Sequence, residues 1–376
     1  MPVDHTKLRD RIKELTSIAA PSGNEDRLVA HVVELLRGGG HEPIVDRIGN
    51  VRVGLGPQPA VDGGLLIFAH LDELGLVVRN VTPDGFLRVH RLGGVPERVL
   101  PGTRLIVHAQ HGDHQAVVGL KAHHLTPPEE KYVARPASDL YLDIGLTSAT
   151  AVVDAGIRVG DPITYAPLWT DLANGRFAAK ALDNRLGVAV LLALIDRWTT
   201  AAPSIPVTVA FSVQEEFNVR GALSIARAVR PTLALCLDIT PATDPPDLVA
   251  ESPVRLGDGP VLSRMSFHGR GTLGGLVPHP ALVRGLEAAA RDAGMPVQYE
   301  AIIGVITDAA FLPMATPEAI ATAGIGIPVR YTHSPVETGS VDDVAATIHL
   351  IEAFARLVPD LDLERGEPQL GLGGMA

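Results

Sequence analysis

The sequence predicts an α/β protein in which a mixed sheet, covered by helices on both faces, is interrupted by a small β-barrel-like insert. Residues 1–73 and 167–360 alternate helical and strand patterns, and their strands are mostly apolar, as in sheets that are buried on both sides. Residues 74–166 instead contain short pieces rich in Val, Leu and Ile, separated by the turn sequences PDG, GG, PG and HGD. Such spacing is typical of a small all-β barrel, so we expect two domains.

The first part of the chain predicts two helices and a buried strand. Apolar residues recur at helical spacing over residues 4–18. Ser22 and Glu25 have the spacing of a capping box, and Gly38 to Gly40 provide a stop, which predicts a second helix between them. The run GLLIFAH at residues 64–70 is continuous and apolar, as expected of a buried strand.

The alternation of helices and strands returns after the insert. A helix is predicted over residues 183–198 and a closing amphipathic helix over residues 341–358. Between them the apolar runs VTVAFSV, LALCLDI and IGIPVRY predict strands. The end of the chain, residues 361–376, finishes in GLGGMA and is predicted to be a frayed tail.

Composition excludes several classes of protein. The 376 residues carry a formal net charge of −11, whereas nucleic acids and anionic membranes are bound by clusters of Lys and Arg. We therefore expect no nucleic-acid partner and no membrane partner. The single cysteine, Cys236, excludes an internal disulfide and a Cys-rich metal site. The N-terminal stretch is charged throughout and lacks the apolar core of a secretory signal, so we expect a cytoplasmic protein.

Residues that can bind a metal follow the predicted strands. In open α/β sheets, ligands bind outside the carboxyl ends of the strands, so these side chains are expected at one edge. A divalent cation there would neutralise charges that are costly to bury. His mixed with carboxylate favours zinc or cobalt, and five ligand positions favour two ions that share a carboxylate. The candidate residues are His70, Asp72, Asp183, Glu215, Glu216, Asp238 and His333.

The adjacent pair Glu215 and Glu216 poses a geometric problem, because neighbouring residues of a strand point to opposite faces. Both can reach one centre only where the strand geometry breaks. We therefore predict that the strand ends near Val213 or Gln214 and that the pair lies in a turn. Taken singly, each candidate also has an ordinary structural role as a hydrogen-bonded His, a helix N-cap or a solvated Glu. Their occurrence together favours the metal site.

Five blocks of sequence carry a family resemblance. AHLDELG, KALDNRLG, SVQEEFNVRGA, LCLDIT and PVRYTHSPVE, in this order, resemble the signature blocks of the tetrahedral (TET) aminopeptidases, a family of dinuclear metallopeptidases. This family includes glutamyl aminopeptidases and proteins labelled endoglucanases. The resemblance implies a zinc-exopeptidase fold, with residues 1–73 and 167–360 as the catalytic domain and residues 74–166 as a dimerisation domain. It also implies that the dimers form a hollow homo-dodecamer that admits only peptides.

The resemblance assigns roles to the candidate residues as well. It implies that Asp183 bridges two metal ions, zinc or cobalt. His70 and Asp238 would complete the site of one ion, and Glu216 and His333 the site of the other. Glu215 would be the general base. Asp72 would fix the imidazole of its neighbour in the first block.

The predicted reaction is the removal of N-terminal residues from peptides. A water activated by both metal ions would attack the scissile carbonyl, and Glu215 would take its proton. Further candidates for contact with the substrate are Asp308, Arg330 and His123, although His123 is also explained as a solvated loop residue. Two alternatives stay open: a metal-dependent amidohydrolase or deacylase of small N-acyl compounds, and an inactive metal-stabilised scaffold. A glycosidase is disfavoured, because glycosidases need two carboxylates that flank a sugar bond.

Overall fold

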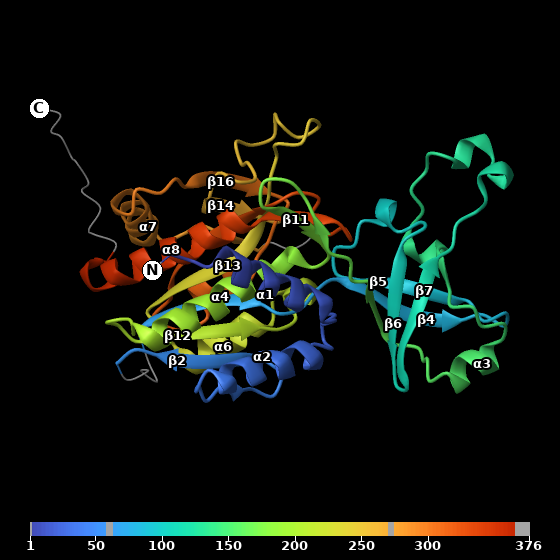
Figure 1. The fold of residues 1–376 in the computed structure, drawn as a ribbon, viewed down its shortest axis with the longest axis horizontal. Helices are drawn as coiled ribbons and strands as arrows, with labels where there is room; N and C mark the ends of the chain where they lie inside the picture. Colours follow the sequence, from blue (N-terminus) through green and yellow to red (C-terminus); the bar gives the residue numbers. More distant parts are fainter. Residues whose placement is uncertain (1, 58–62, 270–273, 365–376) are drawn as a thin grey trace, which may run out of the picture.

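The computed structural model describes residues 2–57, 63–269 and 274–364, and in this range it contains the predicted α/β body and β-barrel insert (Figure 1). A nine-stranded mixed sheet has the order β1-β2-β12-β3-β13-β17-β14-β15, with β16 paired to β14. Its strands are β1 (Ile44–Val45), β2 (Val51–Leu55), β3 (Leu65–His70), β12 (Val207–Ser212), β13 (Leu233–Pro241), β14 (Val261–Phe267), β15 (Gly275–Leu276), β16 (Gln298–Ile303) and β17 (Ala321–Val329). The predicted fold class is confirmed. Residues 365–376 of the predicted tail lie outside the described range.

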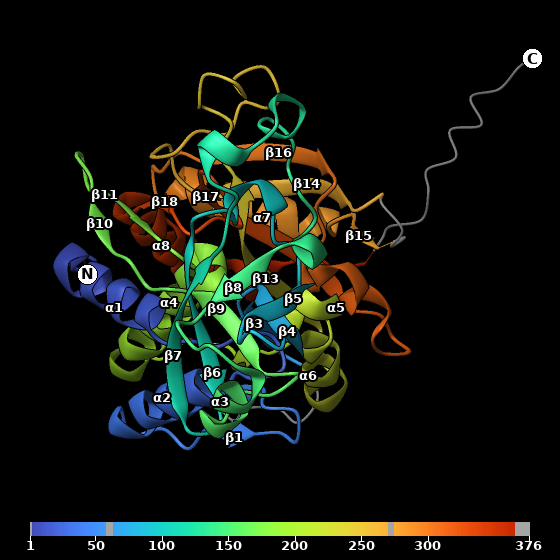
Figure 2. The same ribbon diagram turned by 90° about the vertical axis from the view of Figure 1, so that its right-hand side faces the viewer.

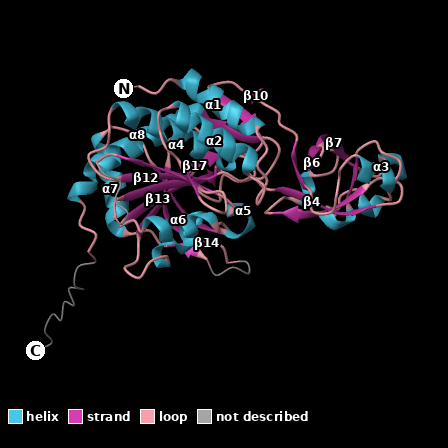
Figure 3. Ribbon diagram, turned by 90° about the horizontal axis from the view of Figure 1, so that it is seen from below, coloured by secondary structure: helices cyan, strands magenta, loops and turns pink. Residues whose placement is uncertain are grey.

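Helices cover both faces of this sheet (Figure 3). On one face, alternate apolar residues of β3 belong to one core with residues of α1 (His5–Ser17), α2 (Asp26–Gly38), α4 (Leu182–Thr200), α7 (Pro280–Asp292) and α8 (Val341–Leu357). On the other face, the intervening residues Leu66 and Phe68 pack against α6 (Gly221–Val229) and the 3-10 helix η5 (Asp308–Met314). Burial of β3 on both sides explains why its sequence is a continuous apolar run. None of the helices in the described range is both long and apolar enough to cross a membrane.

The first predicted helix is confirmed, but the prediction of a capping box at the second helix is wrong. The Asp4 side chain caps α1 by accepting hydrogen bonds from the backbone N–H groups of Thr6 and Lys7. In contrast, α2 begins only at Asp26, and its N-cap residue Glu25 makes no side-chain capping bond. The Glu25 carboxylate instead accepts a hydrogen bond at 3.0 Å from the backbone N–H of Gln214, far along the chain. The same carboxylate accepts a hydrogen bond from the backbone N–H of Gly23 at 2.8 Å, so Glu25 joins its own turn to a distant segment and forms no capping box with Ser22.

The insert is a closed barrel that projects from the body of the molecule (Figure 1) and lies in front of the body in the view of Figure 2. It has its own apolar core, separate from the cores of the sheet. Its strands occupy residues 75–165, inside the range 74–166 predicted for the insert. They are β4 (Gly75–Val81), β5 (Leu87–Leu92), β6 (Arg104–Ala109), β7 (Gly112–Val118), β8 (Tyr141–Asp143) and β9 (Pro162–Tyr165), with the helix α3 (Ala149–Asp154). A three-stranded sheet of β10 (Thr170–Asp171), β11 (Arg176–Ala179) and β18 (Glu337–Ser340) follows in the body.

The main sheet opens between β3 and β13. β12 runs parallel to β3 over its whole length, as far as the pair Ser212 and His70. β13 pairs with β3 only as far as Cys236, and then continues beside β17 to Pro241. Asp238 therefore lies within β13, not at its end as predicted. The separation of the two strands leaves room beyond His70 for a site at the carboxyl edge of the sheet.

Candidate metal centre

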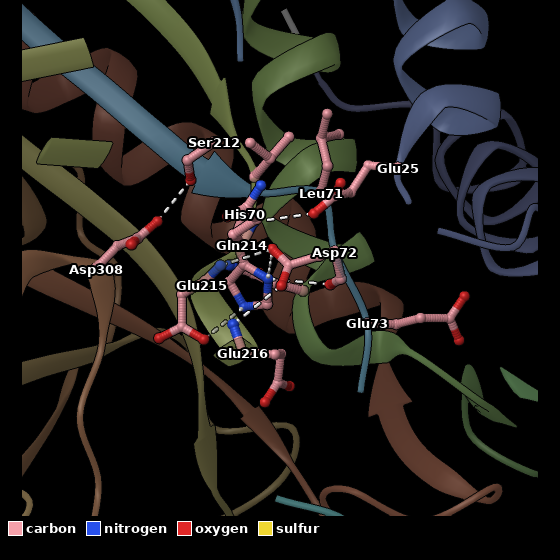
Figure 4. Close-up of polar contacts among 12 residues, drawn as sticks. Glu25, His70, Leu71, Asp72, Glu73, Ser212, Gln214, Glu215, Glu216 and Asp308 are labelled. Atoms are coloured by element: carbon pink, nitrogen blue, oxygen red, sulfur yellow. Dashed lines mark hydrogen bonds and ion pairs between the residues drawn. The ribbon is translucent and has the colours of Figure 1, made fainter. Parts of the chain in front are cut away.

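His70 is the last residue of β3, and only 2% of its surface is exposed. Its Nδ1 donates a hydrogen bond to the carbonyl oxygen of Asp72 at 3.1 Å and lies 3.5 Å from the Asp72 carboxylate (Figure 4). Its Nε2 faces Asp183 at 3.1 Å and Asp238 at 3.8 Å, and this nitrogen can bind a metal once it has lost its proton. An imidazole held in this way through one nitrogen presents the other as a metal ligand.

Asp183 connects two imidazoles from distant parts of the chain. It lies at the start of α4, where the backbone of Asp183 and Asn184 departs from helical geometry. Its Oδ1 is 3.1 Å from Nε2 of His70, and its Oδ2 is 3.4 Å from Nε2 of His333. Burial tends to raise the pKa of Asp183, but the hydrogen bonds with His333 and His70 outweigh it and hold this pKa below its usual value.

Two groups of ligand atoms share this carboxylate. His70, Asp183 and Asp238 form one group, and Asp183, Glu216 and His333 form the other. Within each group the ligand atoms lie within 4.8 Å of one another. Oε1 of Glu216 is buried and has no hydrogen-bond partner in the described part of the chain. Because an unpaired buried oxygen is costly, this donor set fits two cations that share one carboxylate.

The strand geometry breaks just before the two glutamates, as predicted. β12 ends at Ser212, Gln214 adopts a left-handed conformation with φ 59°, and Glu215 begins the short helix α5 (Glu215–Asn218). The Asp72 carboxylate accepts hydrogen bonds from the backbone N–H groups of Glu215 at 2.9 Å and of Glu216 at 3.0 Å (Figure 4). Asp72 therefore fixes the glutamate pair as well as facing the imidazole. The pair lies in the single turn of helix α5, outside the strand, in agreement with the predicted turn.

Asp183, Glu216, Asp238 and His333 line one cavity of about 390 Å³, whereas the buried His70 is not part of its lining. Glu215 lies in its wall beside both ligand groups, with Oε2 4.0 Å from Nε2 of His70. The acidic residues share the wall with apolar side chains, among them Phe217, Ile239 and Ile306. A concave site with a few convergent polar groups and apolar walls is suited to binding a small molecule or the end of a chain.

Comparison with known proteins identifies the family. The model of the M42 glutamyl aminopeptidase family matches residues 49–350. The chain belongs to the M42 glutamyl aminopeptidase family. It is an aminopeptidase, a hydrolase that acts on peptide bonds, and the resemblance to the TET aminopeptidases is confirmed.

Relatives of this M42 aminopeptidase match it over most of their length. SgcX of Escherichia coli (strain K12) is 38% identical over 336 residues, which cover 89% of this chain and 90% of SgcX. Lysyl aminopeptidase of Pyrococcus furiosus is 30% identical over 334 residues, which cover 88% of this chain and 91% of that protein. Aminopeptidase APDkam598 from the archaeon Desulfurococcus kamchatkensis has a similar structure, with a TM-score of 0.86, 34% identity and coverage of 94% and 95%. The Pyrococcus horikoshii TET1 peptidase, which can assemble into a tetrahedron or a large octahedral shell, gives a TM-score of 0.82 at 28% identity, with coverage of 93% and 99%.

Burial sets the electrostatics of the aminopeptidase site. It raises the pKa of Glu215 well above the usual value; His70 opposes this rise, and Asp238 and Glu216 add to it. Burial also raises the pKa of Glu216 to about 7. At His333 burial acts in the lowering direction, but Glu216 and Asp183 raise the pKa to about 10. The centre therefore holds protons that a divalent cation would displace.

Glu337, the first residue of β18, is a site residue that the sequence prediction missed. Its buried carboxylate accepts hydrogen bonds from the backbone N–H of His333 at 2.6 Å and of Asp183 at 3.1 Å. Burial, with Asp183 nearby, raises the pKa of Glu337 to about 8, although His333 opposes the rise. Glu337 ends the block PVRYTHSPVE, but nothing in its spacing indicates that it fixes two other residues of the centre. That function depends on β18 lying beside the start of α4.

The insert also contributes to the centre. Nδ1 of His333 donates a hydrogen bond at 3.0 Å to the carbonyl oxygen of Gly94, in the loop that follows β5. The hydroxyl of Tyr165, at the end of β9, donates to the carbonyl oxygen of His333 at 3.3 Å. The only sequence signal at Gly94 is the GG pair, which predicts a turn but no contact with His333. The barrel and the sheet therefore jointly orient His333.

The three residues proposed for contact with the substrate lie outside the cavity lining in the described part of the chain. Asp308 is buried beside the centre and accepts a hydrogen bond from the Ser212 hydroxyl at 2.6 Å (Figure 4). The Nε of Arg330 donates to Asp244 at 2.7 Å. His123 lies in the exposed 3-10 helix η2 (His123–Leu125) of the insert. Their contact with substrate stays a prediction.

Proposed function

We propose that this aminopeptidase hydrolyses the N-terminal peptide bond of peptides with two divalent metal ions, zinc or cobalt. The observation that carries the proposal is the position of Asp183, whose two oxygens face the imidazoles of His70 and His333. We assign His70 and Asp238 to one ion, Glu216 and His333 to the other, and Asp183 to both. When bound, the ions supply a water nucleophile at neutral pH and polarise the scissile carbonyl.

Glu215 is the general base in this proposal. It belongs to neither ligand group, but its carboxyl lines the cavity between them. It accepts a proton from the attacking water and donates it to the leaving amine, so it must be held near both. The hydrogen bonds from its own backbone and that of Glu216 to Asp72 hold it there.

The variant Glu215→Gln tests this assignment. It keeps the size and hydrogen-bonding capacity of the side chain but removes the base. We expect the bound metal to stay near two ions per chain while kcat/KM for aminoacyl-anilides falls at least about a thousandfold. As a matched control, Glu216→Gln should lower the metal content as well as the activity. Turnover near the wild-type rate in Glu215→Gln would sink the role given to this residue.

The choice of substrate separates the proposal from its alternatives. An aminopeptidase requires a free amino group next to the scissile bond, so we expect hydrolysis of aminoacyl-anilides and none of N-acetyl amino acids. The reverse preference would identify a deacylase of small N-acyl compounds. Hydrolysis of neither by the metal-loaded protein would identify an inactive scaffold.

We further propose that the chain forms a homo-oligomer, a tetrahedral dodecamer built from dimers that associate through the insert. The support is the assembly described for the Pyrococcus horikoshii TET1 peptidase, together with apolar side chains exposed on the insert. A hollow assembly of this kind would restrict the substrates to peptides. The domain boundaries 1–73, 74–166 and 167–360 and the cytoplasmic location belong to the same proposal.

A further inference from the structure

A narrow branch leaves the active-site cavity beside β13. Four residues line both the cavity and the branch, so the two adjoin: Asp238, Ile239, Val305 and Thr307. The branch has a volume of about 20 Å³, which is room for one group of the size of a water molecule. From there the branch crosses β17 at Gly324 and Gly326 and ends between β14 and β16. Ser263 and Glu300 line this inner end. The branch therefore connects the metal centre to a polar end wall on the same face of the sheet.

The branch exists because β17 has no side chains where it is crossed. A Cβ atom on Gly326 would lie 2.9 Å from Cβ and Cγ2 of Thr240. A Cβ atom on Gly324 would lie 3.3 Å from the side chain of Leu276. Gly324 and Gly326 are two positions apart on a strand and so face the same side. Leu276 and Ser263, the neighbours that a Cβ atom on Gly324 would meet, line the branch, so a larger residue at Gly324 would narrow it.

Glu300 places a carboxylate at the inner end. It lies opposite Ser263 in the pairing of β16 with β14, and it accepts a hydrogen bond from the hydroxyl of Thr240. Burial raises the pKa of Glu300, the bond from Thr240 opposes this, and Asp238 adds to the rise. Among the described residues no Lys or Arg lines the cavity or the branch. No basic side chain of the lining therefore neutralises Glu300, and a cation that enters the branch can pair with its carboxylate.

A second polar group at the inner end also lacks a partner. Ser263 is only 7% exposed, and its Oγ has no hydrogen-bond partner within the described residues. A buried hydroxyl without a partner carries a desolvation cost, which a ligand with hydrogen-bond donors relieves. Ser263 and Glu300 together suit a group that brings several donors and a positive charge.

We propose that Glu300 binds the side chain of the first residue of the substrate and that the preferred first residue is lysine. The inference rests on the proposed aminopeptidase function, which places that residue beside the metal centre. The aliphatic stem packs against Ile239 and Val305, and the ammonium group enters the branch and donates to Glu300 and Ser263. The narrow branch suits the compact ammonium group better than the planar guanidinium of arginine. An acidic first residue is repelled by Glu300 and Asp238.

Two substrates that differ only at the tip of the side chain test this inference. Norleucine has the four-carbon stem of lysine without the terminal ammonium group, so lysyl- and norleucyl-p-nitroanilide isolate the contribution of that group. We expect the wild-type enzyme to favour the lysyl substrate in kcat/KM by about tenfold to a hundredfold, as for a charge-assisted hydrogen bond. In Glu300→Gln this ratio should fall to about one, with hydrolysis of the norleucyl substrate within about threefold of wild type. The control Glu287→Gln, which changes a Glu on α7 paired with Arg264 at the surface, should leave the ratio unchanged.

The ratio of kcat/KM for the lysyl and norleucyl substrates shows whether Glu300 recognises the substrate or only stabilises the fold. If Glu300 only stabilises the fold, the variant loses both activities together and the ratio persists, which overturns the inference. A wild-type ratio of one or less overturns it too, while continued hydrolysis of the norleucyl substrate leaves the proposed aminopeptidase function standing. Hydrolysis of neither substrate would overturn both. Should Glu300→Gln fold poorly, Gly324→Ala provides a second variant, because its Cβ would lie beside Leu276 and Ser263 in the branch and should lower the same ratio.

Discussion

At the scale of single residues, the centre depends on buried carboxylates that bind backbone rather than side chains. Asp72 accepts from the N–H groups of Glu215 and Glu216, and Glu337 accepts from those of His333 and Asp183. Each carboxylate therefore sets the position of two residues of the centre at once. Backbone donors are fixed in space more firmly than long side chains, so the ligands are held in place before a metal binds. Such preorganisation supports metal affinity from the outer shell of a site.

The same buried groups predict how the metal-free protein responds to pH. The pKa values of Glu216 and Glu337 are raised from 4.5 to about 7 and about 8, and that of His333 from 6.5 to about 10. Between pH 6 and 8 the folded chain therefore holds protons that the unfolded chain has released, and the free energy of unfolding must fall as the pH rises. The expected loss is on the order of 1 kcal/mol per pH unit for each such group. Thermal unfolding of chelator-treated protein measures it.

Two controls accompany the measurement of thermal unfolding at different pH values. Zinc or cobalt should raise the unfolding temperature more at pH 8 than at pH 6, because the metal replaces the protons that these groups hold. The variant Glu337→Gln removes one titrating group and should flatten the slope. A metal-free protein that becomes more stable from pH 6 to pH 8 would contradict the assignment.

At the scale of elements, the insert is part of the active centre as well as a separate barrel. The loop after β5 approaches the ring of His333 so closely that only glycine fits there. A Cβ atom on Gly94 would lie 2.9 Å from both Cε1 and Nδ1 of that ring. The hydrogen bond from Nδ1 to the Gly94 carbonyl directs Nε2 toward Asp183. The position of the barrel therefore determines the orientation of one proposed ligand.

The variant Gly94→Ala tests this connection. We expect the displaced imidazole to weaken binding of the ion assigned to Glu216 and His333 by about tenfold to a hundredfold, the usual effect of disturbing the outer shell of a metal site. The other ion should bind as before. Calorimetric titration of chelator-treated protein with zinc separates the two sites. Gly38→Ala, at the end of α2 where a Cβ meets nothing within 4 Å, is the matched control. If Gly94→Ala and Gly38→Ala bind zinc with equal affinity at this site, the insert has no role in the metal centre.

At the scale of the whole molecule, the insert presents apolar side chains to solvent. The segment that connects β7 to β8 exposes 76% of Leu125 and 95% of Tyr132, and ion pairs of Glu130 with Lys121 and Arg135 tie its two sides together. Exposed apolar groups gathered on one projecting segment are typical of a surface that associates with another chain. This observation agrees with the proposed association of dimers through the insert.

The proposed assembly predicts a mass in solution of about twelve chains. Replacing Leu125 and Tyr132 together by Asp and Glu should release smaller species, because charged groups cannot be buried against a second insert without a partner. Sedimentation velocity measures the mass, and circular dichroism checks that the variant stays folded. A folded variant that keeps the full assembly would show that the dimer contact lies elsewhere.

The sequence by itself determined the fold class and the residues of the centre. Continuous apolar runs identify buried strands, and the segment from residue 74 to residue 166 has the spacing of a barrel. His70, Glu216, Asp238 and His333 became candidates because ligand-type residues lie at the ends of such strands, and Asp183 because it lies at the start of a predicted helix. The family resemblance supplied the division into two groups. The break before Glu215 was also predictable, because two neighbours on a strand cannot face one centre.

Only the tertiary structure decided how these residues are held and what lies beside them. Glu25 has the spacing of a capping box, yet it binds the backbone of Gln214. Gly94 and Glu337 acquire their functions from contacts with His333, which lies in another part of the chain or across a turn. The branch that ends at Glu300 exists because three strands bring two glycines and an acidic residue together. Periodicity and spacing report interactions within a segment, whereas the orientation of ligands and the shape of a cavity depend on which distant segments the folded chain brings into contact.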